Sequence, residues 1–229
     1  MTEELRQAFA EIGARLAQDL RGQRFGINII SLQNQEAYQL RYPLQGELWI
    51  EVLDVHPRLR HLVLDVSGDR LPASGRFLCG HDESHWFVAG LQFGRKSASV
   101  RGAMESLKPE IVKREQRRQQ VRHQRDRRQN RAYTRQGEWF FLPRPKMRVP
   151  DWLVERDGQL SRAGGKPHRV DELYRAPERD EVFVRGRVQH VDHQTIEFDV
   201  WQRVVQNNEH EADSGLILRQ QPSLIEWED

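Results

Sequence analysis

The sequence contains a single cysteine, Cys79, among its 229 residues. An intramolecular disulfide and an all-cysteine zinc site within one chain are therefore excluded. No stretch approaches the roughly 20 apolar residues that a membrane-spanning helix requires. The acidic, amphipathic start MTEELRQAFAEI is unlike a signal peptide. Together these absences predict a cytoplasmic protein with no membrane partner.

The chain also lacks any catalytic or nucleotide-binding motif of high specificity, so no enzyme class and no cofactor follows from its motifs. Hydrophobic residues make up only 37% of the sequence, and charged residues 31%. Six Trp, nine Phe and four Tyr nevertheless supply large buriable side chains, which argues against disorder. The length suits one large domain or two small ones, each with a real core.

Positive charge is concentrated in residues 113–135, which hold nine arginines and one lysine against two acidic residues. This segment carries +8, and because the whole chain carries +2, the remainder carries −6. The span from Pro109 to Tyr133 has no internal glycine or proline and is rich in helix-forming Gln and Arg. Its few apolar residues form no continuous stripe. We therefore expect a long exposed helix here, roughly 35 Å in length at ~1.5 Å per residue.

The rest of the pattern predicts an α+β fold with one or more mixed, mainly antiparallel sheets. Apolar residues at helical spacing predict an amphipathic N-terminal helix over residues 2–22, capped by Thr2 and ended by Gly22. Alternating and β-branched runs over 25–93 predict an antiparallel sheet packed on that helix. A hairpin is expected over 181–206, and a short helix over 170–174 after a loop-rich stretch.

The expected organisation has three parts. Residues 1–95 form an N-terminal α+β portion, 96–136 a helical segment with the basic arm, and 137–229 a C-terminal β-rich portion. The sequence leaves open whether the last portion forms one domain with the first. A basic arm on an acidic body is typical of proteins with a polyanionic partner.

The arginine-rich segment is the first candidate binding element, and nucleic acid is its expected partner. Guanidinium groups bind phosphate bidentately and stack on bases, and the interspersed Gln and Asn side chains can read base edges. RNA is favoured over DNA because no helix-turn-helix or zinc-finger spacing is present. The expected contacts are Lys113, Arg114, Arg117, Arg118, Arg122, Arg125, Arg127, Arg128, Arg131, Arg135 and Lys166, assisted by Arg101, Arg144, Lys146, Arg148 and the loop 162–169.

Three alternatives stay open for the same segment. It can be a solvated spacer helix, a structural arm that docks on an acidic protein or a ribonucleoprotein, or an arm that binds the acidic body of a second copy. Charge alone does not separate these alternatives.

Histidines clustered with carboxylates form the second candidate. In the stretch CGHDESH, a hairpin turn can bring imidazole and carboxylate groups together as ligands for Zn²⁺ or Mn²⁺. The ordinary explanation is a turn with a buried, inert cysteine before it. Convergence of several histidines would make a metal-dependent nuclease or hydrolase the alternative function, with a divalent metal as cofactor. The catalytic candidates are His81, Asp82, His85, His168 and Glu172, and the metal candidates are His81, His85, His190 and His193.

Overall fold

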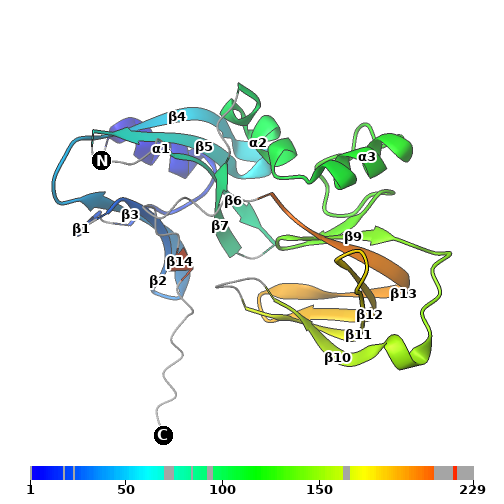
Figure 1. The fold of residues 1–229 in the computed structure, drawn as a ribbon. Helices are drawn as coiled ribbons and strands as arrows, with labels where there is room; N and C mark the ends of the chain where they lie inside the picture. Colours follow the sequence, from blue (N-terminus) through cyan, green and yellow to red (C-terminus); the bar gives the residue numbers. More distant parts are fainter. Residues whose placement is uncertain are drawn as a thin grey trace, which may run out of the picture. The chain divides into compact units, whose positions relative to one another are not determined.

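The computed structural model describes residues 2–17, 19–22, 24–69, 75–83, 85–91, 95–161, 166–208 and 219–220. The chain divides into two compact units, one comprising Met1–Leu107 with Glu209–Asp229 and the other Lys108–Asn208. The described residues form three mostly antiparallel sheets and three short α-helices (Figure 1). The predicted α+β class is confirmed, with strands as the larger part, and no long central helix is present in this part of the chain.

The first unit contains two four-stranded sheets, with strand orders β1-β3-β2-β14 and β4-β5-β6-β7. Its helices are α1 (Glu3–Glu11), η1 (Pro57–Leu59), η2 (Arg95–Ala98) and α2 (Val100–Ser106). Its strands are β1 (Leu20–Gly22), β2 (Gly26–Leu32), β3 (Gln35–Pro43), β4 (Leu48–His56), β5 (His61–Gly68), β6 (Gly75–Asp82), β7 (His85–Leu91) and β14 (Arg219–Gln220).

Both sheets and α1 share one core, in which Leu5 and Phe9 pack with Tyr38 of β3 and Leu64 of β5. The buried Tyr38 hydroxyl lies within hydrogen-bonding distance of two backbone carbonyls of the second sheet, at 2.8 and 3.0 Å. The described strands β2 to β7 thus belong to two sheets rather than to the single sheet predicted over 25–93, because the apolar faces of both strand groups are needed to enclose α1.

The N-terminal helix is shorter than predicted. Thr2 caps it as expected, with its hydroxyl accepting from the N–H of Leu5 at 3.4 Å. The helix ends at Glu11 because Gly13 adopts φ 76°, and the N–H groups of Gly13 and Ala14 close onto the last turn. The predicted stop at Gly22 was wrong, since Leu20–Gly22 forms the edge strand β1.

The second unit consists of α3 (Glu110–Arg118) and a six-stranded sheet of order β10-β11-β12-β13-β9-β8. One core cluster includes Trp139, Phe141 and Val184, and a separate cluster joins Val112 of α3 to Phe140. The remaining bounds are β8 (Thr134–Gln136), β9 (Trp139–Pro143), η3 (Asp151–Leu153), β10 (Glu155–Leu160), β11 (His168–Ala176), β12 (Glu181–His190) and β13 (His193–Gln206).

The predicted hairpin over 181–206 is confirmed as β12–β13, but the helix predicted over 170–174 was wrong. That stretch lies inside β11, which pairs antiparallel with β10 and β12. The register of β11 on β12 shifts between Val170 and Glu172, and Val170 and Leu173 are both buried in the same cluster. Two buried residues three positions apart imitate helical spacing, which explains the error.

The prediction of a long arginine-rich helix was also wrong. Helix α3 ends at Arg118, and Gln120 follows with a left-handed φ of 53°. Ala132 and Tyr133 are buried in the same cluster as Val112. A straight helix would hold residues 112 and 132 about 30 Å apart. Burial of these apolar groups therefore requires the chain to fold back, and a helix without an apolar stripe has little to resist this.

Within the described parts of the chain, none of the helices has the length and apolar character needed to cross a membrane.

Candidate metal centre and basic loop

The arginine loop, defined here as residues 119–133, is organised around one backbone carbonyl. The carbonyl oxygen of Arg125 accepts hydrogen bonds from Lys108 Nζ (2.9 Å), Gln116 Nε2 (2.8 Å) and the Tyr133 hydroxyl (2.7 Å). Lys108 also forms an ion pair with Asp126 at 2.8 Å, and its side chain is only 4% exposed. Donors from before α3, from α3 itself and from the end of the loop therefore hold the loop backbone in place.

The basic side chains of this segment differ in exposure. Arg117 and Arg118 on α3 pair with Glu110 (2.7 Å) and Glu115 (2.6 Å), respectively. The exposed arginines of the loop, Arg122, Arg127 and Arg131, in contrast make no side-chain hydrogen bond or ion pair with any described residue. The exposed members of the predicted contact set are Arg114, Arg117, Arg118, Arg122, Arg127, Arg131 and Lys166, and the less exposed members are Lys113, Arg125, Arg128 and Arg135.

The assisting basic residues lie in several places. Arg101 is exposed on α2 of the first unit, whereas Lys146 and Arg148 are exposed in the second unit. Arg144 is less exposed, and burial lowers the pKa of its guanidinium. Lys166 pairs with Asp192 at 2.9 Å. Residues 162–165 of the predicted anion-binding loop lie outside the described residues.

Three histidines meet at one end of the second unit's sheet. His168 begins β11, His190 ends β12 and His193 begins β13, and β11, β12 and β13 are consecutive neighbours in the sheet. One possible ligand atom from each histidine lies within 4.8 Å of the others. The rings are stacked, with centroids separated by 4.2 Å for His168 and His190 and by 4.7 Å for His190 and His193.

His168 is the buried member of this group, at 1% exposure, and neither of its ring nitrogens has a hydrogen-bond partner among the described residues. Burial, followed by the neighbouring His190 and His193, lowers the pKa of His168 to about 3. The pKa of His190 is also lowered, chiefly by burial and then by His193. Both imidazoles are therefore neutral at pH 7, which is the form that binds metals.

His81 and His85 lie in the β6–β7 hairpin of the first unit, and the described residues of this unit contain no group of three metal ligands. His85 Nδ1 pairs with Glu36 Oε1 at 2.8 Å. The His81 ring packs edge-on against Trp86. Cys79 is buried, and burial raises the pKa of its thiol far above the ordinary value, which keeps the thiol protonated.

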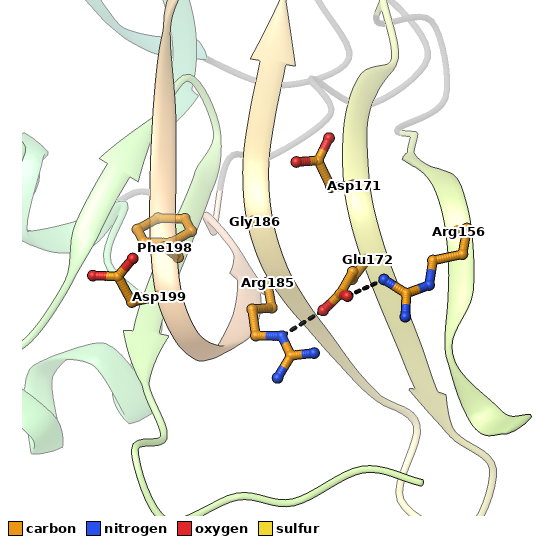
Figure 2. Close-up of a pocket in the computed structure, with 7 residues that line it drawn as sticks. All are labelled: Arg156, Asp171, Glu172, Arg185, Gly186, Phe198 and Asp199. Carbon is orange, nitrogen blue, oxygen red and sulfur yellow. Dashed lines mark hydrogen bonds and ion pairs between the residues drawn. The ribbon is translucent and has the colours of Figure 1, made fainter. Parts of the chain in front are cut away.

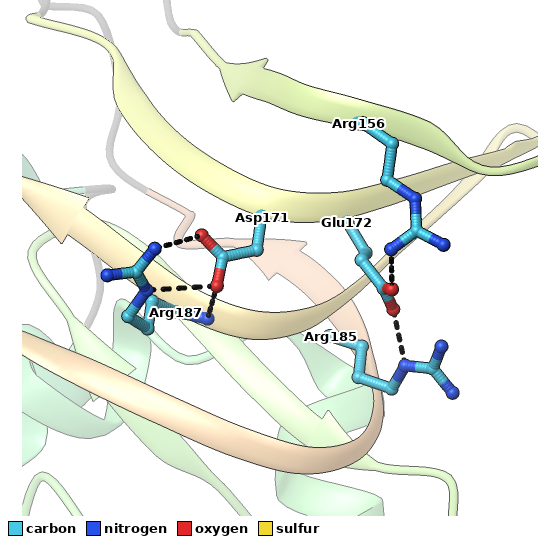
Figure 3. Close-up of polar contacts among 5 residues, drawn as sticks. All are labelled: Arg156, Asp171, Glu172, Arg185 and Arg187. Atoms are coloured by element: carbon cyan, nitrogen blue, oxygen red, sulfur yellow. Dashed lines mark hydrogen bonds and ion pairs between the residues drawn. The ribbon is translucent and has the colours of Figure 1, made fainter.

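Glu172 and Asp171 are paired with arginines and are not part of the histidine group. Glu172 accepts from Arg156 and Arg185, and the hydrogen bond from Arg185 is the largest cause that lowers the pKa of Glu172 (Figure 2). Asp171 binds the Arg187 side chain and backbone N–H, at 3.0 and 2.9 Å (Figure 3). A carboxylate held by two guanidiniums is a poor general base, because it resists protonation.

These groups line an open pocket of about 340 Å³ formed by Arg156, Asp171, Glu172, Arg185, Gly186, Phe198 and Asp199 (Figure 2). The sequence pattern indicated Glu172 as a catalytic candidate but did not indicate this network. The sequence signal for this network is the alternation of Arg185 and Arg187 in β12, together with the acidic pair Asp171 and Glu172 in β11. Oppositely charged side chains favour facing positions on paired strands, so this pattern predicts ion pairs between the two strands.

No protein-family model matches the chain, and searches of curated proteins and of solved structures give no match.

Proposed function

We propose that this chain is a nucleic-acid-binding protein, with RNA favoured over DNA, and that the arginine loop supplies its main phosphate contacts. The observation that carries the proposal is the exposure of Arg122, Arg127 and Arg131 without acidic partners among the described residues. Guanidinium groups in this state are available for bidentate contact with phosphate oxygens.

The anchoring of the loop supports this proposal. Three hydrogen bonds to the Arg125 carbonyl hold the backbone that presents the arginines, so less conformational freedom is lost on binding. Helix α3 has nine residues and a length of only about 14 Å. A short helix followed by a compact loop is better suited to irregular or single-stranded RNA than to lying along a duplex groove.

The salt dependence of binding provides the first test. If Arg114 and the three loop arginines each neutralise one phosphate of a single strand, log Kd should change with log salt at a slope of about 2.8. Between 50 and 200 mM KCl the affinity would then fall roughly 50-fold. Fluorescence anisotropy with a labelled single-stranded RNA of mixed sequence measures this slope, and a duplex DNA of equal length tests the RNA preference.

A matched pair of variants separates the loop from general electrostatics. The triple variant Arg122→Gln, Arg127→Gln, Arg131→Gln should weaken RNA binding by at least tenfold, because three contacts at roughly 0.5–1 kcal/mol each are lost. The control replaces the exposed Arg6, Arg58 and Arg179 with Gln, which removes the same charge elsewhere. Equal loss in both variants would reject the loop as the binding element. Stable co-purification of a protein at high salt, without RNA binding, would instead favour docking on an acidic partner.

A metal-dependent nuclease or other hydrolase is a second candidate, favoured by the convergence of His168, His190 and His193. Three imidazoles leave a coordination position for water on a tetrahedral ion, as in hydrolytic zinc sites. Incubation of labelled RNA with the protein and Zn²⁺, with a His193→Gln variant as control, tests this candidate. Cleavage that is equal in both samples would reject it.

A further inference from the structure

The three histidines form a donor set that is drawn from separate strands rather than from one turn. His190 and His193 pair with each other in the β12–β13 ladder, and His168 comes from the neighbouring β11. In a tetrahedral zinc site with Zn–N distances of about 2.05 Å, ligand nitrogens lie about 3.4 Å apart. The observed separation of up to 4.8 Å is therefore about 1.4 Å larger than a bound site needs. Metal binding would then require the two less buried rings to rotate toward His168.

His168 gives an independent reason to expect a ligand. Its ring is buried, and within the described part of the chain both nitrogens lack a hydrogen-bond partner. An unsatisfied buried donor or acceptor costs about 1–3 kcal/mol, so such groups require an explanation. Coordination of one nitrogen by a metal ion would satisfy that nitrogen and use the lone pair of the neutral ring.

Ligand chemistry then selects the metal. The donor set is entirely imidazole, and the closest described carboxylate in this turn, Asp192, is paired with Lys166. Mg²⁺ and Ca²⁺ prefer oxygen ligands, whereas imidazoles suit Zn²⁺, Cu²⁺, Ni²⁺ and Co²⁺. We propose that His168, His190 and His193 bind one divalent transition-metal ion, with Zn²⁺ as the expected occupant and one coordination position left to solvent.

The surroundings of His190 specify what must change on binding. Its Nδ1 accepts a hydrogen bond from the N–H of Asp192 at 3.1 Å, and the ring also interacts with the backbone of Lys166. A coordinated His190 gives one nitrogen to the metal and keeps the other for a backbone contact of this kind, which orients the ring. Metal binding should therefore rearrange the 190–193 turn without unfolding β12 or β13.

Zinc titration of the full chain, expressed without a polyhistidine tag and stripped with a chelator, tests this proposal. We expect one Zn²⁺ per chain by isothermal titration calorimetry, and visible absorption bands of tetrahedral Co²⁺ when CoCl₂ replaces zinc. His190→Gln and His193→Gln, which alter the less buried ligands, should each weaken zinc binding by at least about tenfold. The matched control is His85→Gln, because His85 pairs with Glu36 in the first unit and is outside the proposed site.

Circular dichroism of each variant verifies that it is folded, so that a loss of binding is not a loss of structure. No zinc binding by the wild-type chain would overturn the proposal, as would binding that is unchanged in both His190→Gln and His193→Gln. Binding lost equally in His85→Gln would also overturn it. The outcome is independent of RNA binding by the arginine loop, because the zinc titration contains no nucleic acid.

Discussion

Replacement of the buried Lys108 by methionine is the sharpest test of how the arginine loop is held. The Nζ of Lys108 donates to the Arg125 carbonyl at 2.9 Å and to Asp126 at 2.8 Å. Methionine has a similar length and no donor, so it keeps the packing of the stem and removes both hydrogen bonds. We expect the variant to be less stable and to bind RNA more weakly.

The magnitude follows from opposing terms. Each hydrogen bond to a charged group contributes about 1.5–3 kcal/mol, so the loss of two amounts to roughly 3–6 kcal/mol. The desolvation cost of a buried ammonium disappears in the variant, and Asp126, whose side chain is 29% exposed, regains water. The Arg125 carbonyl keeps its bonds from Gln116 and Tyr133. The net loss should be about 2 kcal/mol in the free energy of unfolding.

Urea denaturation followed by tryptophan fluorescence measures this loss, and a midpoint shift of about 1 M is expected at an ordinary m-value. Lys113→Met is the matched control: its ammonium lies 3.9 Å from the exposed Glu110, so its removal should cost less than about 0.5 kcal/mol. RNA binding by Lys108→Met should be about fivefold weaker than that of the wild-type chain, because binding must then order the loop. Equal stability of the two variants would show that the network does not hold the loop.

Three further predictions concern stability. Because the folded pKa of His168 is about 3 and the ordinary value is 6.5, the unfolded chain binds more protons between these two pH values. Stability should therefore fall as the pH drops below 6.5, and this group should remove about 2 kcal/mol at pH 5 in a sample treated with a chelator. Urea midpoints at about pH 7 and pH 5 measure the loss. Tyr38→Phe removes a buried hydroxyl near two carbonyls and should cost about 1–2 kcal/mol in urea unfolding. Gly186→Ala should lower the melting temperature, since Gly186 has φ 82° and an added Cβ would lie 2.8 Å from Asp171 Cβ, at a cost of about 1–3 kcal/mol; an unchanged melting temperature would contradict the described register.

Local pattern was sufficient for most strands and insufficient for element ends. Strand alternation and turn residues predicted the individual strands β2 to β7 and the β12–β13 hairpin, although not the division of β2 to β7 between two sheets, because both signals depend on neighbouring residues. The extent of α1 was wrong because apolar spacing continued through Leu16 and Leu20 after the backbone had already turned at Gly13. Periodicity records which side chains are buried, and it does not record the conformation that buries them.

The arginine-rich segment shows the same limit in another form. Helix propensity favoured a long helix, but Tyr133 has its ring in the core and its hydroxyl on the Arg125 carbonyl. Such contacts depend on a chain reversal that propensity does not encode, so tertiary packing outweighs it. The exposure of the arginines followed from composition, whereas their presentation by a loop required the structure.

Part of the histidine site could be predicted from the sequence. The hairpin tip placed His190 and His193 together, which the turn pattern predicted. The addition of His168 depends on the pairing of β11 with β12, and the expected helix over 170–174 concealed that strand. Had the HRVDELY stretch been interpreted as a strand before the hairpin, an antiparallel meander would have placed its first residue beside His190.

The basic loop and the histidine cluster are connected through one short hairpin, so the two proposals have a joint consequence. The arginine loop leads into β8, where the N–H of Arg135 donates to the Arg128 carbonyl at 2.6 Å. The next residue, Gln136, donates from Nε2 to the Gln194 carbonyl at 2.6 Å, and Gln194 follows His193 in the chain. An added Cβ on Gly137, in the turn after β8, would lie 3.0 Å from His193 Nε2. A metal that fixes His193 must therefore also restrain this turn and the end of the arginine loop. Linkage requires that any factor by which zinc tightens RNA binding equals the factor by which RNA tightens zinc binding. A factor above one in the wild-type chain, together with a factor of one in His193→Gln, would indicate coupled sites, whereas a factor of one in both proteins would indicate two independent sites.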